Sequence, residues 1–255
     1  MKSLKGKNIV VCGYHWIGCK AIEIFQAAGA NVYVYTHAAG EGVPCVASYC
    51  RKAGVAITLE RISASNLPFT PDVIASVYYR YLIKPDVIER VGGRIFNLHP
   101  SLLPKYRGCS SLTWAMVQKQ ATAGYTYHYI DAGCDTGNII LQQPIPIEPF
   151  DTQQTLYYRV MFQAVQNLIP AVELVFNSAP GVPQTGEATH FKRGAPYNGV
   201  IDPAWPAEDV EHFIRAMTFP PYPYATFLGT PVRTFEDYVA QRGTNLPSSP
   251  GLNRG

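Results

Sequence analysis

The residues best suited to chemistry lie in the stretch FNLHPSLLPKYRG, residues 96–108. Asn97 and His99 are two positions apart at the end of a strand-like run. Side chains on a strand alternate between its faces, so these two point to the same side. Pro100 keeps His99 extended, because a residue that precedes proline avoids helical backbone angles. The pattern predicts a carboxamide and an imidazole directed into one crevice at the edge of a sheet.

A second stretch, DAGCDTG at residues 131–137, predicts a tight acidic turn between two strands. Its glycines permit backbone angles that other residues avoid. A carboxylate from this turn that hydrogen-bonds His99 would fix the imidazole tautomer and raise its pKa above the reference value of ~6.5. Asn97, His99 and Asp135 would then form an amide donor, a base and an orienting acid, a set that suits acyl transfer to an amine. The alternative is that Asn97 and Asp135 only cap turns while His99 packs.

The elements that must position these side chains follow an alternating pattern. Short β-branched runs alternate with helix-period segments through the first two thirds of the chain, which is typical of a parallel sheet covered by helices. We expect strands at residues 8–14, 31–37, 55–60, 72–79, 94–99, 124–131 and 138–147. We expect helices at residues 17–30, 44–53, 84–93, 111–120 and 151–178. The last helix has Asp151 or Thr152 as its predicted N-cap and an interruption at Pro170.

The composition of the chain changes after residue 178. Pro- and Gly-rich pieces surround one predicted helix at residues 206–219 and short strands near residues 224–239. We interpret residues 1–178 as a catalytic domain and residues 179–255 as a smaller α+β C-terminal subdomain. The end of the chain, NLPSSPGLNRG, has the composition of a disordered tail.

Composition disfavours several classes of protein. The 255 residues carry 21 basic and 18 acidic side chains, a net charge of +3 that is too small to predict a nucleic-acid partner. Six cysteines have irregular spacings, and no Cys/His cluster predicts a metal site. No run approaches the ~20 apolar residues of a membrane helix, and no leader opens the chain. We therefore expect a cytoplasmic protein with reduced thiols and no membrane partner.

Two further stretches carry weaker signals. GYHWIGCK (13–20) does not match a P-loop, because its lysine is Lys20 and no Ser or Thr follows. It also lacks the three close glycines of a dinucleotide fingerprint. SVYYRYLIKP (76–85) places tyrosines and an arginine at the carboxyl end of a central strand, where open α/β sheets bind ligands, and we expect a binding role. Five histidines have no carboxylate or cysteine at ligand spacing, and most are predicted to be structural or surface residues: His15, His37, His128, His190 and His212.

The Asn-x-His pair and the acidic loop together resemble the active-site motifs of the folate-dependent formyltransferases. GYHWIGCKAIEIFQAAGANVYVYTH and VYYRYLIKPDVIERV resemble the amino-sugar members of that family. GVIDPAWPAEDVEHFIRAMTFPPYP resembles the C-terminal part of GDP-perosamine-type N-formyltransferases. The resemblance covers about residues 8–228, and it implies an α/β fold with a Rossmann-like, mostly parallel sheet, the formyltransferase fold.

The resemblance also implies a reaction: formyl transfer from 10-formyltetrahydrofolate, without a metal, to a nucleotide-linked amino sugar of the 4-amino-4,6-dideoxyhexose type. The product would serve O-antigen or another surface glycan. Asn97 would stabilise the oxyanion, His99 would transfer the proton, and Asp135 would raise the pKa of His99. The folate would lie against Tyr81, Leu82, Ile83, Asp131, Ala132, Gly133 and Cys134. Some relatives have an arginine where this chain has Cys109, so no contact is carried over there.

A nucleotide-linked sugar needs aromatic faces for its base and cations for its diphosphate. Candidates of this chemistry are Tyr14, Trp16, Tyr79, Arg80, Lys192, Arg193, Tyr197 and Trp205. Residues 178–255 hold six Lys and Arg against seven Asp and Glu, which disfavours a tRNA acceptor.

Several alternatives stay open. The acceptor can instead be glycinamide ribonucleotide or a hydroxyornithine, or the chain can be a non-catalytic module that binds sugar nucleotides. Neither the sugar nor the nucleotide base follows from the sequence. The apolar stretch FPPYPYATFLG (219–229) predicts packing across the two-fold axis of a homodimer.

Overall fold

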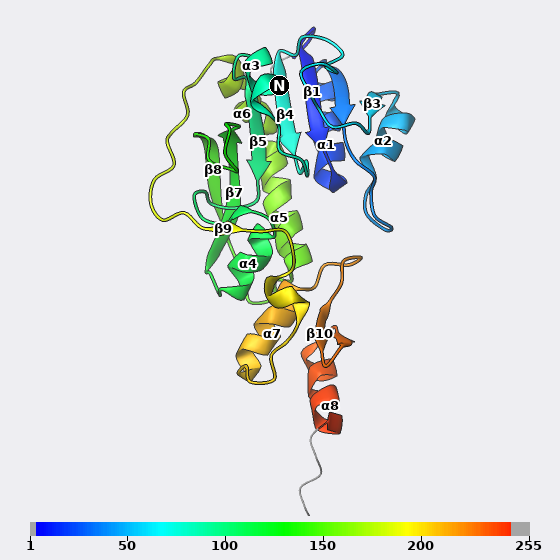
Figure 1. Cartoon of the computed structure of the whole chain (residues 1–255), viewed down its shortest axis with the longest axis vertical. Helices are drawn as coiled ribbons and strands as arrows, with labels where there is room; N and C mark the ends of the chain where they lie inside the picture. The colour runs from blue at the N-terminus through cyan, green and yellow to red at the C-terminus, as the bar shows by residue number, and fades with distance from the viewer. Residues whose placement is uncertain (1–3, 246–255) are drawn as a thin grey trace, which may run out of the picture.

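A seven-stranded sheet forms the centre of the computed structural model, which describes residues 4–245 (Figure 1). The strand order is β3-β2-β1-β4-β5-β7-β8. The parallel strands are β1 (Asn8–Gly13), β2 (Asn31–Tyr35), β3 (Ala56–Thr58), β4 (Val73–Val77) and β5 (Ile95–His99). The antiparallel strands are β7 (Thr122–Tyr129) and β8 (Ile139–Pro146). The mostly parallel α/β sheet predicted from the sequence is confirmed.

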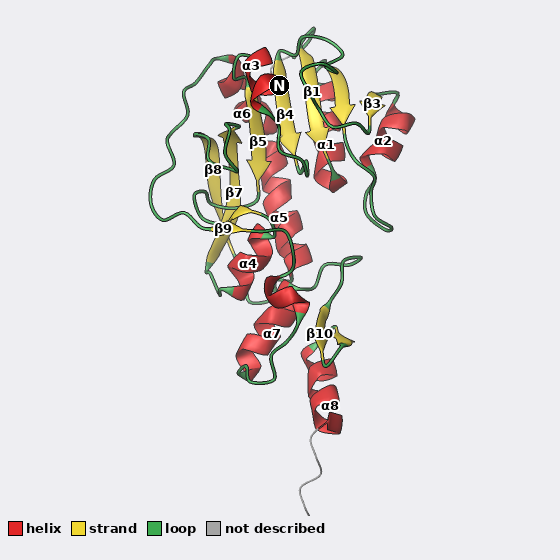
Figure 2. Cartoon of the chain, in the orientation of Figure 1, coloured by secondary structure: helices red, strands yellow, loops and turns green. Residues whose placement is uncertain are grey.

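Helices cover both faces of this sheet (Figure 2). One face packs against α1 (His15–Ala27), α2 (Val46–Ala53), α4 (Ser111–Val117), α5 (Gln153–Gln166) and α6 (Leu168–Phe176), and the other against α3 (Pro85–Arg90). The centre of β1 is apolar because both of its faces are buried. Ile9 and Val11 join the larger core, whereas Val10 and Cys12 join the core beneath α3, because successive side chains point to opposite faces.

The single long helix expected at residues 151–178 is two helices, with α5 ending at Gln166 and α6 beginning at Leu168. Pro170 has no N–H to donate to the carbonyl of Gln166, and its ring clashes with that carbonyl. α5 therefore ends four residues before the proline, and Asn167 separates the two helices. Thr152 is the N-cap of α5, as predicted, and its hydroxyl accepts a hydrogen bond from the Thr155 N–H at 3.2 Å.

Beyond α6 the chain first returns to the sheet region. β9 (His190–Phe191) pairs in parallel with β6 (Arg107–Gly108), a pairing that no pattern in the sequence indicates. The short 3-10 helix η1 (Pro196–Gly199) follows. The remaining elements are α7 (Ala207–Ala216), β10 (Ala225–Phe227), β11 (Thr230–Val232) and α8 (Phe235–Asn245). They enclose a separate small core around Val210, Phe213 and Tyr238, while the domain boundary at residue 178 stays a prediction.

In this C-terminal region the predicted strands are partly correct, and the predicted dimer contact stays open. The strands predicted near residues 224–239 end at Val232, because α8 begins soon after it. Thr234 and Asp237 cap this helix reciprocally: the Asp237 N–H donates to Thr234 Oγ1 at 3.1 Å, and the Thr234 N–H donates to Asp237 Oδ2 at 3.2 Å. Within residues 219–229, Phe219, Ala225 and Phe227 are buried within the chain itself, whereas Tyr222, Leu228 and the three prolines are exposed. The homodimer therefore stays a prediction. The tail, from residue 246 on, lies outside the described residues.

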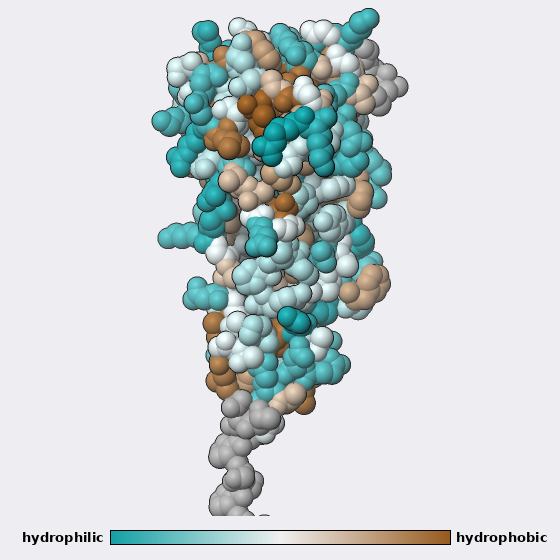
Figure 3. Space-filling model, turned by 90° about the vertical axis from the view of Figure 1, so that its right-hand side faces the viewer, coloured by the Kyte–Doolittle hydropathy of each residue, from teal (hydrophilic) through white to brown (hydrophobic). Residues whose placement is uncertain are grey.

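The surface drawn in Figure 3 is mainly hydrophilic, and its hydrophobic side chains form small separate groups. Within residues 4–245, no helix combines the length and the apolarity that a membrane span needs. The same part of the chain holds no cluster of three His, Cys, Asp or Glu side chains arranged to bind a metal ion.

Candidate active site

Asn97 is oriented by the neighbouring strand. Ser76 on β4 lies opposite Asn97 on β5 in the parallel register, and its hydroxyl donates a hydrogen bond to Asn97 Oδ1 at 2.8 Å. Because the oxygen of the carboxamide is held by β4, the Nδ2 amine is turned toward the acidic loop, where it lies 3.4 Å from Asp135 Oδ1. The donor group of Asn97 therefore faces Asp135, another of the predicted catalytic residues.

His99 ends β5 and is only 4% exposed. Its Nε2 lies 2.8 Å from the carbonyl oxygen of Tyr106. A carbonyl only accepts hydrogen bonds, so Nε2 carries the hydrogen of the neutral ring. The basic atom is then Nδ1, which lies 3.5 Å from Asp135 Oδ2. The backbone of the loop after β5 thus selects the tautomer, and Asp135 faces the nitrogen that takes up a proton.

The expected direction of the His99 pKa shift is wrong. Burial lowers the pKa of His99 below its ordinary value, and the Asp135 carboxylate and the Tyr106 carbonyl raise it only enough to offset part of that effect. Desolvation of the charged ring outweighs one carboxylate at 3.5 Å. The free protein therefore holds His99 as a neutral base at pH 7, with a carboxylate ready to stabilise the imidazolium.

Asp135 occupies a left-handed backbone conformation, with φ at 54°. This turn directs its carboxylate inward, where Oδ2 accepts a hydrogen bond from the Gly108 N–H at 2.8 Å. Burial alone would raise the pKa of Asp135, but His99, His128 and the Gly108 N–H together hold it well below its usual range. Gly137 is required in the same loop, because a Cβ there would lie 1.9 Å from the Tyr129 carbonyl oxygen.

His128 belongs to the site, although the sequence pattern indicated a structural or surface residue. Antiparallel pairing of β5 with β7 puts His128 directly opposite Asn97. Its Nδ1–H donates to the Tyr129 carbonyl at 2.8 Å, which leaves Nε2 as an acceptor 3.2 Å from Asn97 Nδ2. The Nδ2 hydrogens of Asn97 are therefore shared between His128 and Asp135. Thr126 and His128 are two positions apart on β7, so their side chains lie on the same face of the strand. Only the register between β5 and β7 shows that this face meets Asn97.

The three predicted catalytic residues meet at a cavity of about 740 Å³, within the range of about 300–1,000 Å³ typical of ligand sites. Of the predicted binding residues, those that line it are Tyr14, Tyr79, Arg80, Tyr81, Leu82, Cys134 and Arg193. Cys109, which stands where some relatives have arginine, also lines it. The cavity admits a ligand larger than an amino acid while keeping Asn97, His99 and Asp135 in its wall.

Other predicted binding residues lie elsewhere. Trp16 packs against Phe162 on α5, with ring centroids 4.7 Å apart, and Tyr197 packs against Trp205 at 5.0 Å. Ile83 is buried in the core beneath α3. The remaining residues outside the cavity lining are Asp131, Ala132, Gly133 and Lys192. Asp131 instead holds the acidic loop together, since its carboxylate accepts hydrogen bonds from Thr136 Oγ1 at 2.6 Å and the Gly133 N–H at 3.0 Å.

Cations and aromatic rings line the part of the cavity formed by β1, β2 and β4. Burial, and secondarily the charges of Arg80 and Arg193, lower the pKa of His37 to about 4. His37 stacks on Tyr14 with ring centroids 4.0 Å apart. Asp135 is the single acidic residue in the cavity lining. This region therefore offers positive charge and flat faces.

An aromatic wall that the sequence did not predict continues the cavity lining. It includes His15, Tyr78, Tyr157, Phe219 and Tyr222. His15 Nδ1 lies 2.9 Å from the Tyr157 hydroxyl, and burial lowers the pKa of His15 to about 4. His15 is therefore a neutral member of an otherwise aromatic surface. Its φ of 62° turns its side chain toward this wall at the first residue of α1.

Fold and site together define a class of protein. The sequence profile of the Formyl transferase family matches residues 25–172, more than half of the chain, and the protein belongs to that family. Within the family, the chain is 41% identical over 157 residues to the GDP-perosamine N-formyltransferases of Brucella melitensis biotype 1 and Brucella abortus. The match covers 62% of this chain and 61% of each relative, so it spans less than two thirds of their length.

Solved structures show the same fold. The crystal structure of WlaRD, a sugar 3N-formyl transferase in the presence of dTDP and 5-N-formyl-THF, superposes with a TM-score of 0.72 at 22% identity. The similarity covers 89% of this chain and 85% of that one. An N-formyltransferase from Helicobacter canadensis in complex with folinic acid and dTDP-3-aminofucose gives a TM-score of 0.74 at 20% identity, over 89% and 86% of the two chains.

Proposed function

We propose that the protein transfers a formyl group from 10-formyltetrahydrofolate to the amino group of a nucleotide-linked 4-amino-4,6-dideoxy sugar. The observation that carries this proposal is the convergence of Asn97, His99 and Asp135 at one cavity of about 740 Å³. The 41% identity to two GDP-perosamine N-formyltransferases supports the choice of acceptor. Folate and sugar-nucleotide ligands in similar solved structures support the choice of substrates.

In this proposal each of the three residues has a step. His99 Nδ1 accepts the proton of the attacking amine, and Asp135 stabilises the imidazolium that results. Asn97 Nδ2 donates to the formyl oxygen as that oxygen gains negative charge. His99 then delivers the proton to the departing folate nitrogen. One C–N bond forms to the sugar amine, one breaks at the folate, and the proton returns to the leaving group.

Asn97 must release one partner to do this. Its Nδ2 carries two hydrogens, which are shared with His128 at 3.2 Å and Asp135 at 3.4 Å. Both contacts are longer than the usual 2.9–3.0 Å of N–H···O bonds in proteins, so a formyl oxygen can compete for either hydrogen. Once Asp135 turns toward an imidazolium, the hydrogen directed at Oδ1 becomes free for the oxyanion.

The two substrates divide the cavity lining between them. Cys134 immediately precedes Asp135, and together with Tyr81 and Leu82 in the same cavity lining it fits a flat pterin. Arg80 and Arg193 supply charge for a diphosphate, and Tyr14 and Tyr79 supply faces for a base or sugar. This division leaves the amine and the formyl group to meet at His99.

Turnover with defined acceptors tests the proposal. We expect the purified protein, given 10-formyltetrahydrofolate, to formylate GDP-linked 4-amino-4,6-dideoxymannose, with release of tetrahydrofolate and a mass increase of one formyl group in the product. Glycinamide ribonucleotide and hydroxyornithine serve as competing acceptors, and thermal stabilisation by each ligand provides an independent measure of binding. Turnover of either competitor in preference to the sugar contradicts the proposed acceptor. Sugar-nucleotide binding without any turnover would instead indicate a non-catalytic binding module.

A further inference from the structure

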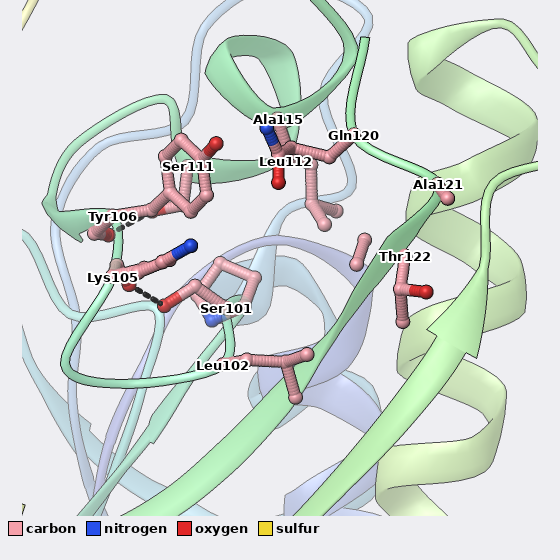
Figure 4. A pocket seen from close by; sticks show the side chains of 12 residues that line it. Ser101, Leu102, Lys105, Tyr106, Ser111, Leu112, Ala115, Gln120, Ala121 and Thr122 are labelled. Atoms are coloured by element: carbon pink, nitrogen blue, oxygen red, sulfur yellow. Dashed lines mark hydrogen bonds between the residues drawn. The ribbon is translucent and has the colours of Figure 1, made fainter. Parts of the chain in front are cut away.

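A second cavity, of about 240 Å³, lies behind the loop that follows β5 (Figure 4). This loop separates it from the active-site cavity, and Pro100, Ser111 and Leu112 line both. Its walls are mostly apolar where α4 and β7 meet, with Ala115 and Ala123 buried in them. The volume is below the range of about 300–1,000 Å³ typical of drug-sized ligands, so an occupant has to be small.

Two polar side chains reach into this second cavity. Figure 4 shows the Lys105 amine pointing into the space between Ser101 and Leu112, and the Gln120 carboxamide turned toward Leu112 from the opposite side. None of the lining residues is acidic. Over residues 4–245, Lys105 has no ion pair, in contrast to Lys119, whose amine lies 2.9 Å from Glu208 and 2.6 Å from Asp209. The cavity therefore combines an apolar floor with one positive charge at its solvent-exposed edge, since Lys105 is an exposed residue.

The wall shared with the active site holds His99. The Tyr106 carbonyl accepts hydrogen bonds from His99 Nε2 at 2.8 Å and from the Ser111 hydroxyl at 2.9 Å. Tyr106 and Ser111 both line the second cavity and are both buried. A ligand seated there would contact the two residues that set the position of the imidazole.

We propose that this second cavity binds a small organic anion, a carboxylate or a phosphate monoester on a short apolar body, with the anionic group at Lys105 and the body against the α4–β7 wall. Occupancy reaches His99 through Tyr106 and Ser111. A charged hydrogen bond to Lys105 provides orientation, and the apolar wall provides most of the buried area. The binding part of this inference stands apart from the proposed formyl transfer, because it concerns different residues.

Binding is tested with benzoate, phenyl phosphate and the neutral analogue benzyl alcohol, using the full-length protein and ligand-observed NMR titration. We expect benzoate or phenyl phosphate to bind more tightly than benzyl alcohol. Lys105→Met, which keeps the aliphatic stem, should weaken anion binding about tenfold or more. Ala121→Phe, at an exposed position on the rim, should block it sterically. Lys52→Met on α2 is the matched control and should bind like the wild type.

The Arg193→Gln variant separates this cavity from the active-site cavity, where an anion can also bind. Anion binding that is lost in Arg193→Gln and retained in Lys105→Met and Ala121→Phe would overturn the proposal, as would the absence of binding by both anions. The link to His99 has its own readout, the ring-proton resonance identified by its loss in His99→Gln. We expect that resonance to shift with benzoate in the wild type and not in Lys105→Met. Lys105-dependent binding without such a shift would overturn the link.

Discussion

The two ends of the active-site cavity are organised in opposite ways. Around Asn97, His99 and Asp135, each polar group has a partner within the protein, and Ser76, the Tyr106 carbonyl and the Gly108 N–H hold the three side chains in place. At the other end, His37 Nδ1 is buried and has no hydrogen-bond partner among the described residues. Arg80 and Arg193 likewise pair with no carboxylate in the part of the chain that the structure describes.

The two ends therefore suit two different tasks, stabilisation of a transition state at one and binding of an anionic ligand at the other. The end that holds the proposed catalytic residues is largely preorganised, so beyond the release of one hydrogen bond of Asn97 little rearrangement is needed when charge develops in the transition state. The cationic end has uncompensated charge and a desolvated imidazole, which an anionic ligand would satisfy. Substitutions at the catalytic end should therefore change turnover, and substitutions at the cationic end should change the affinity for the charged substrate.

The largest expected effect is that of Asn97→Ala. Loss of one oxyanion donor costs about 2.7–4 kcal/mol in related acyl-transfer sites, which lowers turnover about 10²–10³-fold. The folded state should persist, because the change removes no apolar contact. Turnover and thermal unfolding of the purified variant measure both effects, with the exposed Asn177→Ala as control. Near wild-type turnover in Asn97→Ala would contradict the proposed catalytic role of Asn97.

His128→Phe should have a smaller effect at the same end. An aromatic ring is kept, but the acceptor for Asn97 Nδ2 is lost, and kcat should fall about tenfold, the equivalent of 1.4 kcal/mol. The KM for either substrate should change little, because His128 lies outside the cavity lining. His128→Gln retains an acceptor and should restore part of the rate. A variant in which KM rises instead would show that His128 acts through binding.

Arg193→Gln tests the role of the cationic end. We expect the KM for the nucleotide-linked sugar to rise about tenfold, because a charge-assisted contact to phosphate is lost, while kcat stays nearly constant. The adjacent Lys192→Gln is the matched control, since Lys192 lies outside the cavity lining. Steady-state kinetics with each substrate varied in turn measures this. Equal effects of the two substitutions would indicate general electrostatics in place of a specific contact.

The smallest expected effect concerns stability and pH. Burial lowers the pKa of His15 to about 4 in the folded state, against ~6.5 when unfolded. Its contribution to stability is therefore complete above about pH 6.5 and is lost as the pH falls toward 4. Between pH 7 and pH 4, the free energy of unfolding should fall by on the order of 3 kcal/mol more in the wild type than in His15→Gln.

Urea unfolding at several pH values measures this difference. His37 titrates over the same range in both proteins, so the comparison isolates His15. The exposed His190→Gln is the control and should follow the wild type. Parallel pH dependences of the wild type and His15→Gln would contradict the assignment of His15 as a neutral buried residue.

Local patterns were sufficient for much of the fold and for selecting the residues that converge at the cavity. Alternation along residues 94–99, with Pro100 after them, predicted that Asn97 and His99 share one face. Thr152 was recognisable as a cap from its residue type and its place before the apolar run. The contacts of Trp16 and Tyr197 were not predictable in this way, because the direction of an aromatic side chain depends on which element packs beside it.

The order of polar and apolar residues along the chain thus determined the parallel strands, the catalytic pair and the acidic loop, because each depends on neighbours within a few residues. Only the tertiary structure decided that His128 faces Asn97, since that contact arises from the register of two antiparallel strands. It also decided the direction of the His99 pKa shift, because the depth of burial depends on segments far apart in the chain.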